Sequence, residues 1–116
     1  MHNPVIQWEI CAKDPERIVE FYTKLFKWTF NFSAEMKYWH RTKDDDRDIE
    51  GGIFLAQGEM PNYVTLYIQV DDIDAFIEKA VSMGGTKIVG KTEIPDNGSY
   101  GMFIDPEGNP IGLLKR

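Results

Sequence analysis

The chain has 116 residues, of which 42% are hydrophobic and 28% charged, the composition of one ordinary globular domain. The net charge is −6, so phosphate backbones and anionic lipid surfaces would repel the protein, and neither nucleic acid nor a membrane is an expected partner. The single cysteine, Cys11, allows no disulfide within the chain. We find no apolar run near the roughly 20 residues that span a bilayer and no signal peptide, so the expected location is the cytoplasm.

One apolar pattern occurs twice in the chain, with an offset of 58 residues that carries Asp14 onto Asp72. The same offset carries the alternating segment Val5–Cys11 onto Tyr63–Gln69, within the second alternating segment Tyr63–Val70. Each aspartate precedes an apolar pattern of helical spacing, as a helix N-cap does. A pattern repeated over this length predicts two copies of one supersecondary unit.

The first half predicts a strand, a helix and three further strands. The strand covers Val5–Cys11, and Pro15 opens the helix directly after the Asp14 cap. Three β-rich segments follow: Trp28–Phe32, Lys37–Thr42 and Ile53–Gln57. The charged segment 43–50 is expected to be an exposed turn, from which Gly51 and Gly52 lead into the last strand.

The second half repeats this order. Its first strand, Tyr63–Val70, is predicted to point Val64, Leu66 and the later alternating apolar residues inward. A helix capped by Asp72 ends at Gly84-Gly85. Three strands follow: Thr86–Val89, Ser99–Ile104 and Pro110–Leu114. The whole chain therefore predicts an α+β fold of two βαβββ modules, residues 1–58 and 62–116, with curved mixed sheets around a cleft.

The sheet face turned away from the helices carries an unusual set of residues. Because side chains alternate along a strand, Gln7 and Glu9 share this face in the first module, and Thr65 and Tyr67 share it in the second. Trp8 falls on the opposite face and is predicted to lie in the core. This mixture of polar and aromatic side chains favours a ligand cleft, and the alternative is an exposed sheet face.

Several segments resemble the vicinal oxygen chelate superfamily, which includes glyoxalase, bleomycin resistance proteins and dioxygenases. The first-half segments are Val5–Arg17 and Phe21–Trp28, and the second-half segments are Tyr67–Asp74, Gly84-Gly85 and Asp105–Leu113. The second half looks like the short relatives of lactoylglutathione lyase. The resemblance covers nearly the whole chain and implies the same fold, which hosts isomerases, dioxygenases, epimerases and antibiotic-binding proteins and so leaves the function open.

The resemblance also implies a metal site with four ligands, one on the first and one on the last strand of each module. The first-strand positions fall on Gln7, which can ligate a metal, and on Thr65, which is a poor ligand for divalent metals. The last-strand position of the second module falls on Gly112, and that of the first falls among Ile53, Phe54 and Leu55, of which Phe54 is preferred; none of these can ligate. We therefore expect no metal, no other cofactor and no metal-dependent glyoxalase activity.

Two residues could transfer protons without a metal. Glu9 shares the face of Gln7, and His40 lies on the third predicted strand, where it alternates with Tyr38. Together they could act as acid and base if they meet in the cleft. The alternative is that Glu9 accepts a hydrogen bond or an ion pair and that His40 is a half-buried strand residue.

Three functions stay open. The first is binding of a small organic molecule in a cleft lined by Gln7, Glu9, His40, Phe54, Thr65, Tyr67 and Gly112. Gly112 is expected to leave room for a ligand or a neighbouring ring. The second is a metal-independent lyase or isomerase that uses Glu9 or His40. The third is a structural or interaction module that dimerises through the cleft face. A homodimer is expected, because two modules of this size make a shallow cleft alone.

Overall fold

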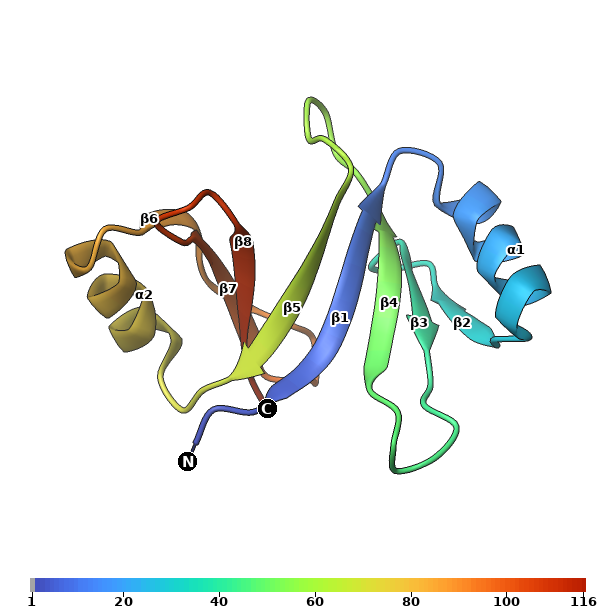
Figure 1. The fold of residues 1–116 in the computed structure, drawn as a ribbon, viewed down its shortest axis with the longest axis horizontal. Helices are drawn as coiled ribbons and strands as arrows, with labels where there is room; N and C mark the ends of the chain where they lie inside the picture. Colours follow the sequence, from blue (N-terminus) through green and yellow to red (C-terminus); the bar gives the residue numbers. More distant parts are fainter. Residues whose placement is uncertain (1) are drawn as a thin grey trace. The chain divides into compact units, whose positions relative to one another are not determined.

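The computed structural model describes residues 2–116. These residues form two compact units: one contains residues 7–64, and the other contains residues 2–6 together with 65–116. The elements follow the order strand, helix and three strands, twice, as Figure 1 shows. The predicted α+β fold of two βαβββ modules is therefore confirmed.

The unit of residues 7–64 contributes four neighbouring strands and one helix. Its elements are β1 (Val5–Ala12), α1 (Pro15–Phe26), β2 (Phe30–Ser33), β3 (Tyr38–Arg41) and β4 (Glu50–Leu55). The strands lie in the order β2-β3-β4-β1. β1 and β4 run parallel, and the other neighbouring pairs are antiparallel. The helix α1 lies on one face of this sheet (Figure 1).

The second unit has the same construction. Its elements are β5 (Tyr63–Gln69), α2 (Ile73–Ser82), β6 (Thr86–Glu93), β7 (Ser99–Ile104) and β8 (Pro110–Lys115). The strands lie in the order β5-β8-β7-β6. β5 and β8 run parallel, whereas β8, β7 and β6 are antiparallel neighbours. The helix α2 lies on one face of this sheet (Figure 1).

Both helices begin at the predicted aspartates. The Asp14 side chain accepts a hydrogen bond from the Arg17 backbone N–H at 3.3 Å, and the Asp72 side chain accepts one from Ala75 at 3.0 Å. Each bond satisfies one N–H group that the first helical turn leaves without a partner. After α2, Gly84 has a φ of +102°, the left-handed conformation for which glycine was expected there.

A cluster of half-buried and exposed aromatic rings lies beside α1, while the buried hydrophobic core residues of this unit are Cys11, Ala12 and Ile53. The Trp28 ring lies 5.6 Å from the Trp8 ring, 5.7 Å from Tyr22 and 5.1 Å from Phe26, measured between centroids. The buried guanidinium of Arg41 lies 4.2 Å from the centroid of Trp28. Trp8 therefore packs on the helix-covered face of the sheet, as alternation predicted, but it is half-buried and is not one of the buried core residues.

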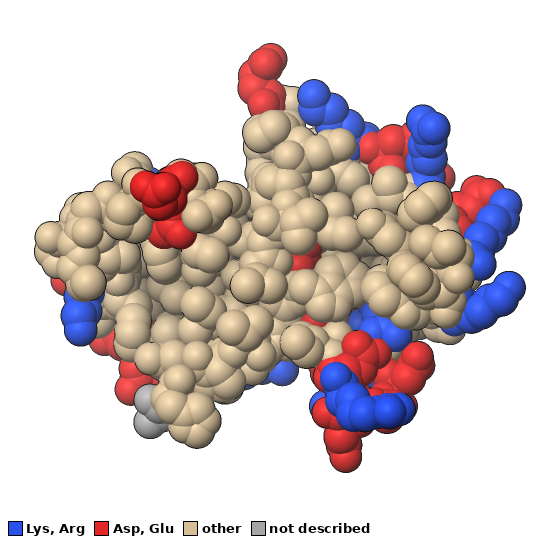
Figure 2. Space-filling model, in the orientation of Figure 1, with Lys and Arg blue, Asp and Glu red and all other residues tan. Residues whose placement is uncertain are grey.

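Arg41 also ties the loop between β3 and β4 to the sheet. Its guanidinium pairs with the carboxylates of Asp44 and Asp48, while Arg47 pairs with Asp45 at 2.8 Å within the loop. Figure 2 shows blue and red side chains gathered together over this loop. The expected charged turn is thus confirmed for residues 43–49.

The core of the second unit is aliphatic. Val70, Ile73, Ile77 and Leu113 are buried against one another, and Phe103 is one of the partly buried residues packed around them. Ile73 and Ile77 come from α2, while Leu113 and Phe103 come from β8 and β7, so their contacts hold α2 to its sheet. No helix among residues 2–116 is long and apolar enough to cross a membrane.

The structure corrects two expectations about the strands. β4 begins at Glu50 and contains Gly51 and Gly52, because the segment pairs with β1 from Glu50 onward. On β5, Val64 and Leu66 were expected inward but are 66% and 43% exposed. The helix α2 packs mainly on β6 and β7, so it leaves the beginning of β5 uncovered.

Candidate functional site

The face of the 7–64 sheet opposite Trp8 carries most of the predicted site residues. We call it the polar face, and its side chains are Gln7, Glu9, Tyr38, His40, Glu50 and Phe54. The strand register places them together: Gln7 pairs with Glu50 across β1 and β4, and Tyr38 pairs with Phe54 across β3 and β4. Residues paired in this way point to the same side of a sheet.

Gln7, Tyr38 and Glu9 form a chain of hydrogen bonds on this face. The Gln7 side-chain amide donates to the Tyr38 hydroxyl at 2.8 Å, and the Tyr38 hydroxyl donates to the Glu9 carboxylate. Glu9 is only 6% exposed. Burial, and then the charge of Glu9, raise the pKa of Tyr38 far above its ordinary value. The hydroxyl therefore stays protonated and remains a hydrogen-bond donor.

A glycine makes room for the Tyr38 ring. Gly52 lies between Glu9 and His40 in the register, and a Cβ atom built there would overlap the Tyr38 ring. The Phe54 ring stacks beside Tyr38 at 6.4 Å between centroids and 8° between planes. Tyr38 and Phe54 thus form an aromatic wall next to the buried carboxylate.

His40 pairs with a residue that the sequence did not single out. Its Nε2 atom lies 3.4 Å from a carboxylate oxygen of Glu50, and the two side chains are 39% and 32% exposed. The structure therefore brings His40 to Glu50, while Glu9 contacts Tyr38. Glu50 was missed because it was assigned to the charged turn. Counting back two positions from Gly52 would have placed it on the same face.

The other predicted site residues, Thr65, Tyr67 and Gly112, belong to the second unit. The Thr65 hydroxyl donates to the Pro110 carbonyl at 2.6 Å. A Cβ atom built on Gly112 would lie 2.5 Å from two carbons of the Tyr67 ring. The neighbouring ring thus occupies the space beside Gly112, which was one of the two expectations for this glycine.

The strand registers identify the position on β4 that matches Gly112. Tyr67 pairs with Gly112 across β5 and β8, and Glu9, which precedes Tyr67 by the repeat offset of 58, pairs with Gly52 across β1 and β4. Gly52 is therefore the counterpart of Gly112, and the assignment of Phe54 to that position was wrong. The last strands are offset by 60 residues, since β4 begins at Glu50 and β8 at Pro110, so the offset of 58 that carries Phe54 onto Gly112 does not hold there.

The donor set does not fit the four-ligand metal site that the resemblance implies. Gln7 donates its amide N–H to Tyr38 and could ligate only through its carbonyl oxygen, while the neutral hydroxyl of the buried Thr65 is a poor ligand and donates to a backbone carbonyl. Gly52 and Gly112 stand at both last-strand positions and offer no side chain. Across residues 2–116, no three His, Cys, Asp or Glu side chains gather in a way that could hold a metal ion.

Comparison with known proteins identifies the family. Residues 5–113 match the Glyoxalase/Bleomycin resistance protein/Dioxygenase superfamily, so the chain belongs to this superfamily, as the resemblance predicted. A curated relative, the putative glyoxylase CFP32 of Mycobacterium bovis, is 28% identical over 110 residues, which are 92% of this chain and 42% of the relative. The chain thus spans about two fifths of the length of that relative.

Solved structures share the fold at low sequence identity. A superfamily member from Vibrio splendidus has a TM-score of 0.67 and 11% identity, with 98% of this chain and 99% of that chain covered. Methylmalonyl-CoA epimerase from Mycobacterium tuberculosis has a TM-score of 0.60 and 14% identity, with 96% and 86% covered. At such identities the likeness shows the fold alone.

Proposed function

We propose that the protein binds a small organic molecule on the polar face and does so without a metal ion. The observation that carries this proposal is the hydrogen-bonded chain Gln7–Tyr38–Glu9 beside the ring of Phe54. A few fixed polar groups next to aromatic rings are typical of small-molecule sites. We place the site on this face and not at Thr65 and Gly112. The Thr65 hydroxyl already donates to the Pro110 carbonyl, and the Tyr67 ring fills the space beside Gly112.

The chemistry of the polar face favours a ligand with an aromatic ring and hydrogen-bond donors. Glu9 and Glu50 supply two carboxylates, which can only accept hydrogen bonds when ionised. The rings of Tyr38 and Phe54 supply a flat apolar wall, on which an aromatic or cationic group can stack. Aromatic amines meet both requirements, whereas aromatic carboxylates would be repelled.

A ligand screen with matched variants tests this proposal. We would measure the melting temperature of the protein with a panel of aromatic amines and aromatic carboxylates, and then titrate any amine that stabilises it. Phe54→Ala and Glu9→Gln should each weaken binding at least about tenfold. Phe32→Ala is the control, since this exposed ring packs at a tilt against Trp39, away from the polar face.

Two results would contradict the proposal. One is an amine that binds equally well to the wild type and to both polar-face variants. The other is a preference for carboxylates over amines across the panel. The metal-free part has its own test, which is elemental analysis of protein purified without a metal-affinity tag. About one zinc, nickel, manganese or iron per chain, lost in Gln7→Ala, would refute it.

A second candidate function is proton transfer by a metal-independent lyase or isomerase. The observation in its favour is the contact between His40 and Glu50 at 3.4 Å, because a carboxylate beside an imidazole can orient it as a general base. The experiment is to incubate bound ligands that have a carbonyl group in D₂O and follow exchange at the neighbouring carbon by NMR. Exchange that is lost in His40→Asn while binding is kept would favour the enzyme, and no exchange would favour binding alone.

A further inference from the structure

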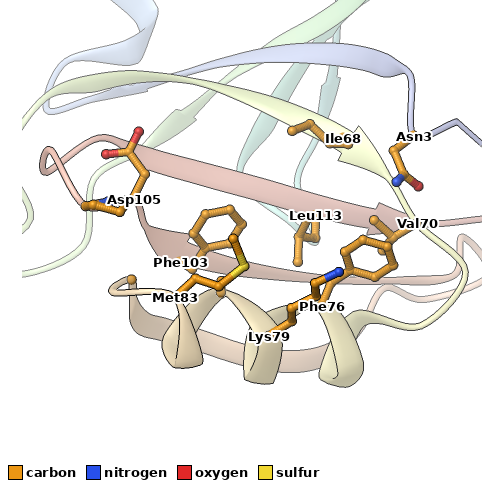
Figure 3. Close-up of a pocket in the computed structure, with 12 residues that line it drawn as sticks. Asn3, Ile68, Val70, Phe76, Lys79, Met83, Phe103, Asp105 and Leu113 are labelled. Carbon is orange, nitrogen blue, oxygen red and sulfur yellow. The ribbon is translucent and has the colours of Figure 1, made fainter.

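The second unit contains a pocket that is separate from the polar face. It has a volume of about 450 Å³ and is formed only by residues from 2–6 and 65–116. Figure 3 shows the side chains that line it from α2 and from the strands beneath, among them Ile68, Phe76, Met83, Phe103 and Leu113. Ile68 and Leu113 are partners across β5 and β8. The pocket therefore lies between the helix and its sheet.

The position of α2 explains why this space is open. The helix packs mainly on β6 and β7, so its other side faces β5 and β8 across a gap. Ala80 and Gly85 line that gap, and residues this small cannot fill it. The volume falls within the roughly 300–1,000 Å³ of typical small-molecule sites. An apolar group bound in the pocket would remove its apolar walls from water, which favours binding.

One cationic side chain stands at the pocket and is available to a ligand. Lys79 on α2 lines the pocket beside Phe76 (Figure 3). Among the residues that the structure describes, no acidic side chain forms an ion pair with it. The other charged lining residue, Asp105, is already engaged, because its carboxylate accepts hydrogen bonds from the side chain and backbone of Asn109.

We propose that this pocket binds an amphipathic carboxylic acid. The apolar part of the ligand lies among Phe76, Met83 and Phe103, and its carboxylate pairs with the Lys79 ammonium. The Asp105 carboxylate repels the same head group, so the two charges set the direction in which the ligand enters. This site does not depend on the function proposed for the polar face.

Octanoate and octylamine are matched probes, since they differ in the charge of the head group. We would follow the methyl resonance of Met83 by NMR during each titration, with the methyl resonances of Ile53 in the other unit as the control. Octanoate should bind up to about fivefold more tightly than octylamine, the upper end of what one partly exposed ion pair contributes. Lys79→Met should remove this preference because it keeps the apolar stem and loses the charge.

Two further variants separate the pocket from general effects. Lys87→Met removes an exposed lysine of β6 that does not line the pocket, and it should leave the preference for octanoate unchanged. Ala80→Phe places a ring in the gap and should abolish the Met83 response to both probes. If Ala80→Phe does not fold, the comparison of Lys79→Met with Lys87→Met still decides the question.

Three outcomes would overturn the proposal. The first is no response of Met83 to millimolar octanoate. The second is equal affinity for octanoate and octylamine in the wild type, or a preference that survives in Lys79→Met. The third is a dimer in light scattering that Ala80→Phe converts to a monomer, since a second copy of the chain would then cover the pocket.

Discussion

Replacing Gly52 by alanine tests the arrangement of the polar face most directly. The added Cβ atom would overlap the Tyr38 ring, so the ring must move away from β4. When it moves, the hydroxyl loses the bond from Gln7 at 2.8 Å and the bond to Glu9. One methyl group therefore disturbs both the packing and the hydrogen bonds of this face.

The expected loss of stability has two parts. Forcing an extra carbon into a packed site costs about 1–3 kcal/mol. Leaving a buried acceptor such as Glu9 without one of its hydrogen bonds costs about 1–3 kcal/mol more. Gly52→Ala should therefore lower the free energy of unfolding by about 2–6 kcal/mol, a large fraction of the roughly 5–15 kcal/mol of an ordinary domain.

Gly90→Ala is the matched control. A Cβ atom at Gly90 would meet only the flexible end of Lys87, with Cε at 3.1 Å and Nζ at 3.2 Å. The lysine can move aside, and alanine restricts the unfolded chain more than glycine does. The free energy of unfolding should therefore change by less than about 1 kcal/mol in either direction.

Urea unfolding at equilibrium measures the change in the free energy of unfolding for both Gly52→Ala and Gly90→Ala. A second comparison uses Gly52→Ala in a Tyr38→Ala background, where the ring is absent and the added methyl group has room. The cost of Gly52→Ala should fall below about 1 kcal/mol there, since the two positions are coupled through the ring. An equal cost in both backgrounds, or a loss as small as that of Gly90→Ala, would refute the reasoning.

Three further predictions concern single side chains. Tyr38→Phe should lower the free energy of unfolding by about 1–3 kcal/mol, because Glu9 loses a hydrogen bond while the ring stays in place, and urea unfolding measures this loss. Asp72→Ala should cost about 1 kcal/mol by removing the N-cap of α2, with a matching fall in the melting temperature. Hydrogen bonds from Asn109 lower the pKa of Asp105 below its ordinary value of about 3.8, so this carboxylate stabilises the fold above about pH 4 and loses that effect as the pH falls through its lower folded pKa. Asp105→Asn should accordingly show a smaller loss of stability between neutral and strongly acidic pH than the wild type.

The sequence by itself determined the fold and the two faces of the first strand. The repeated pattern around Asp14 and Asp72 predicted two βαβββ modules, and both aspartates cap helices as expected. Alternation placed Trp8 on the helix-covered face and Gln7 and Glu9 on the opposite face. These properties are local, since helix caps and strand periodicity depend on neighbouring residues in the chain.

Only the tertiary structure decided how the polar face is built. The Tyr38 ring lies over Gly52 and reaches Glu9 across β4, and this contact depends on the pairing of β1, β4 and β3. The same pairing joins His40 to Glu50 instead of Glu9. A shift of two residues in the register would change every one of these neighbours, and the alternating pattern reads the same after such a shift.

The pocket under α2 was also beyond the reach of sequence patterns. The apolar residues at helical spacing correctly predicted that α2 packs on its sheet, but every strand of that sheet offers an apolar face to the helix. Which strands α2 covers depends on how its side chains fit those of β6 and β7. That fit leaves Ile68 and Leu113 at the edge of an open space beside Lys79. Sequence patterns do not predict this space, because the packing of a helix against a sheet depends on contacts between residues far apart in the chain.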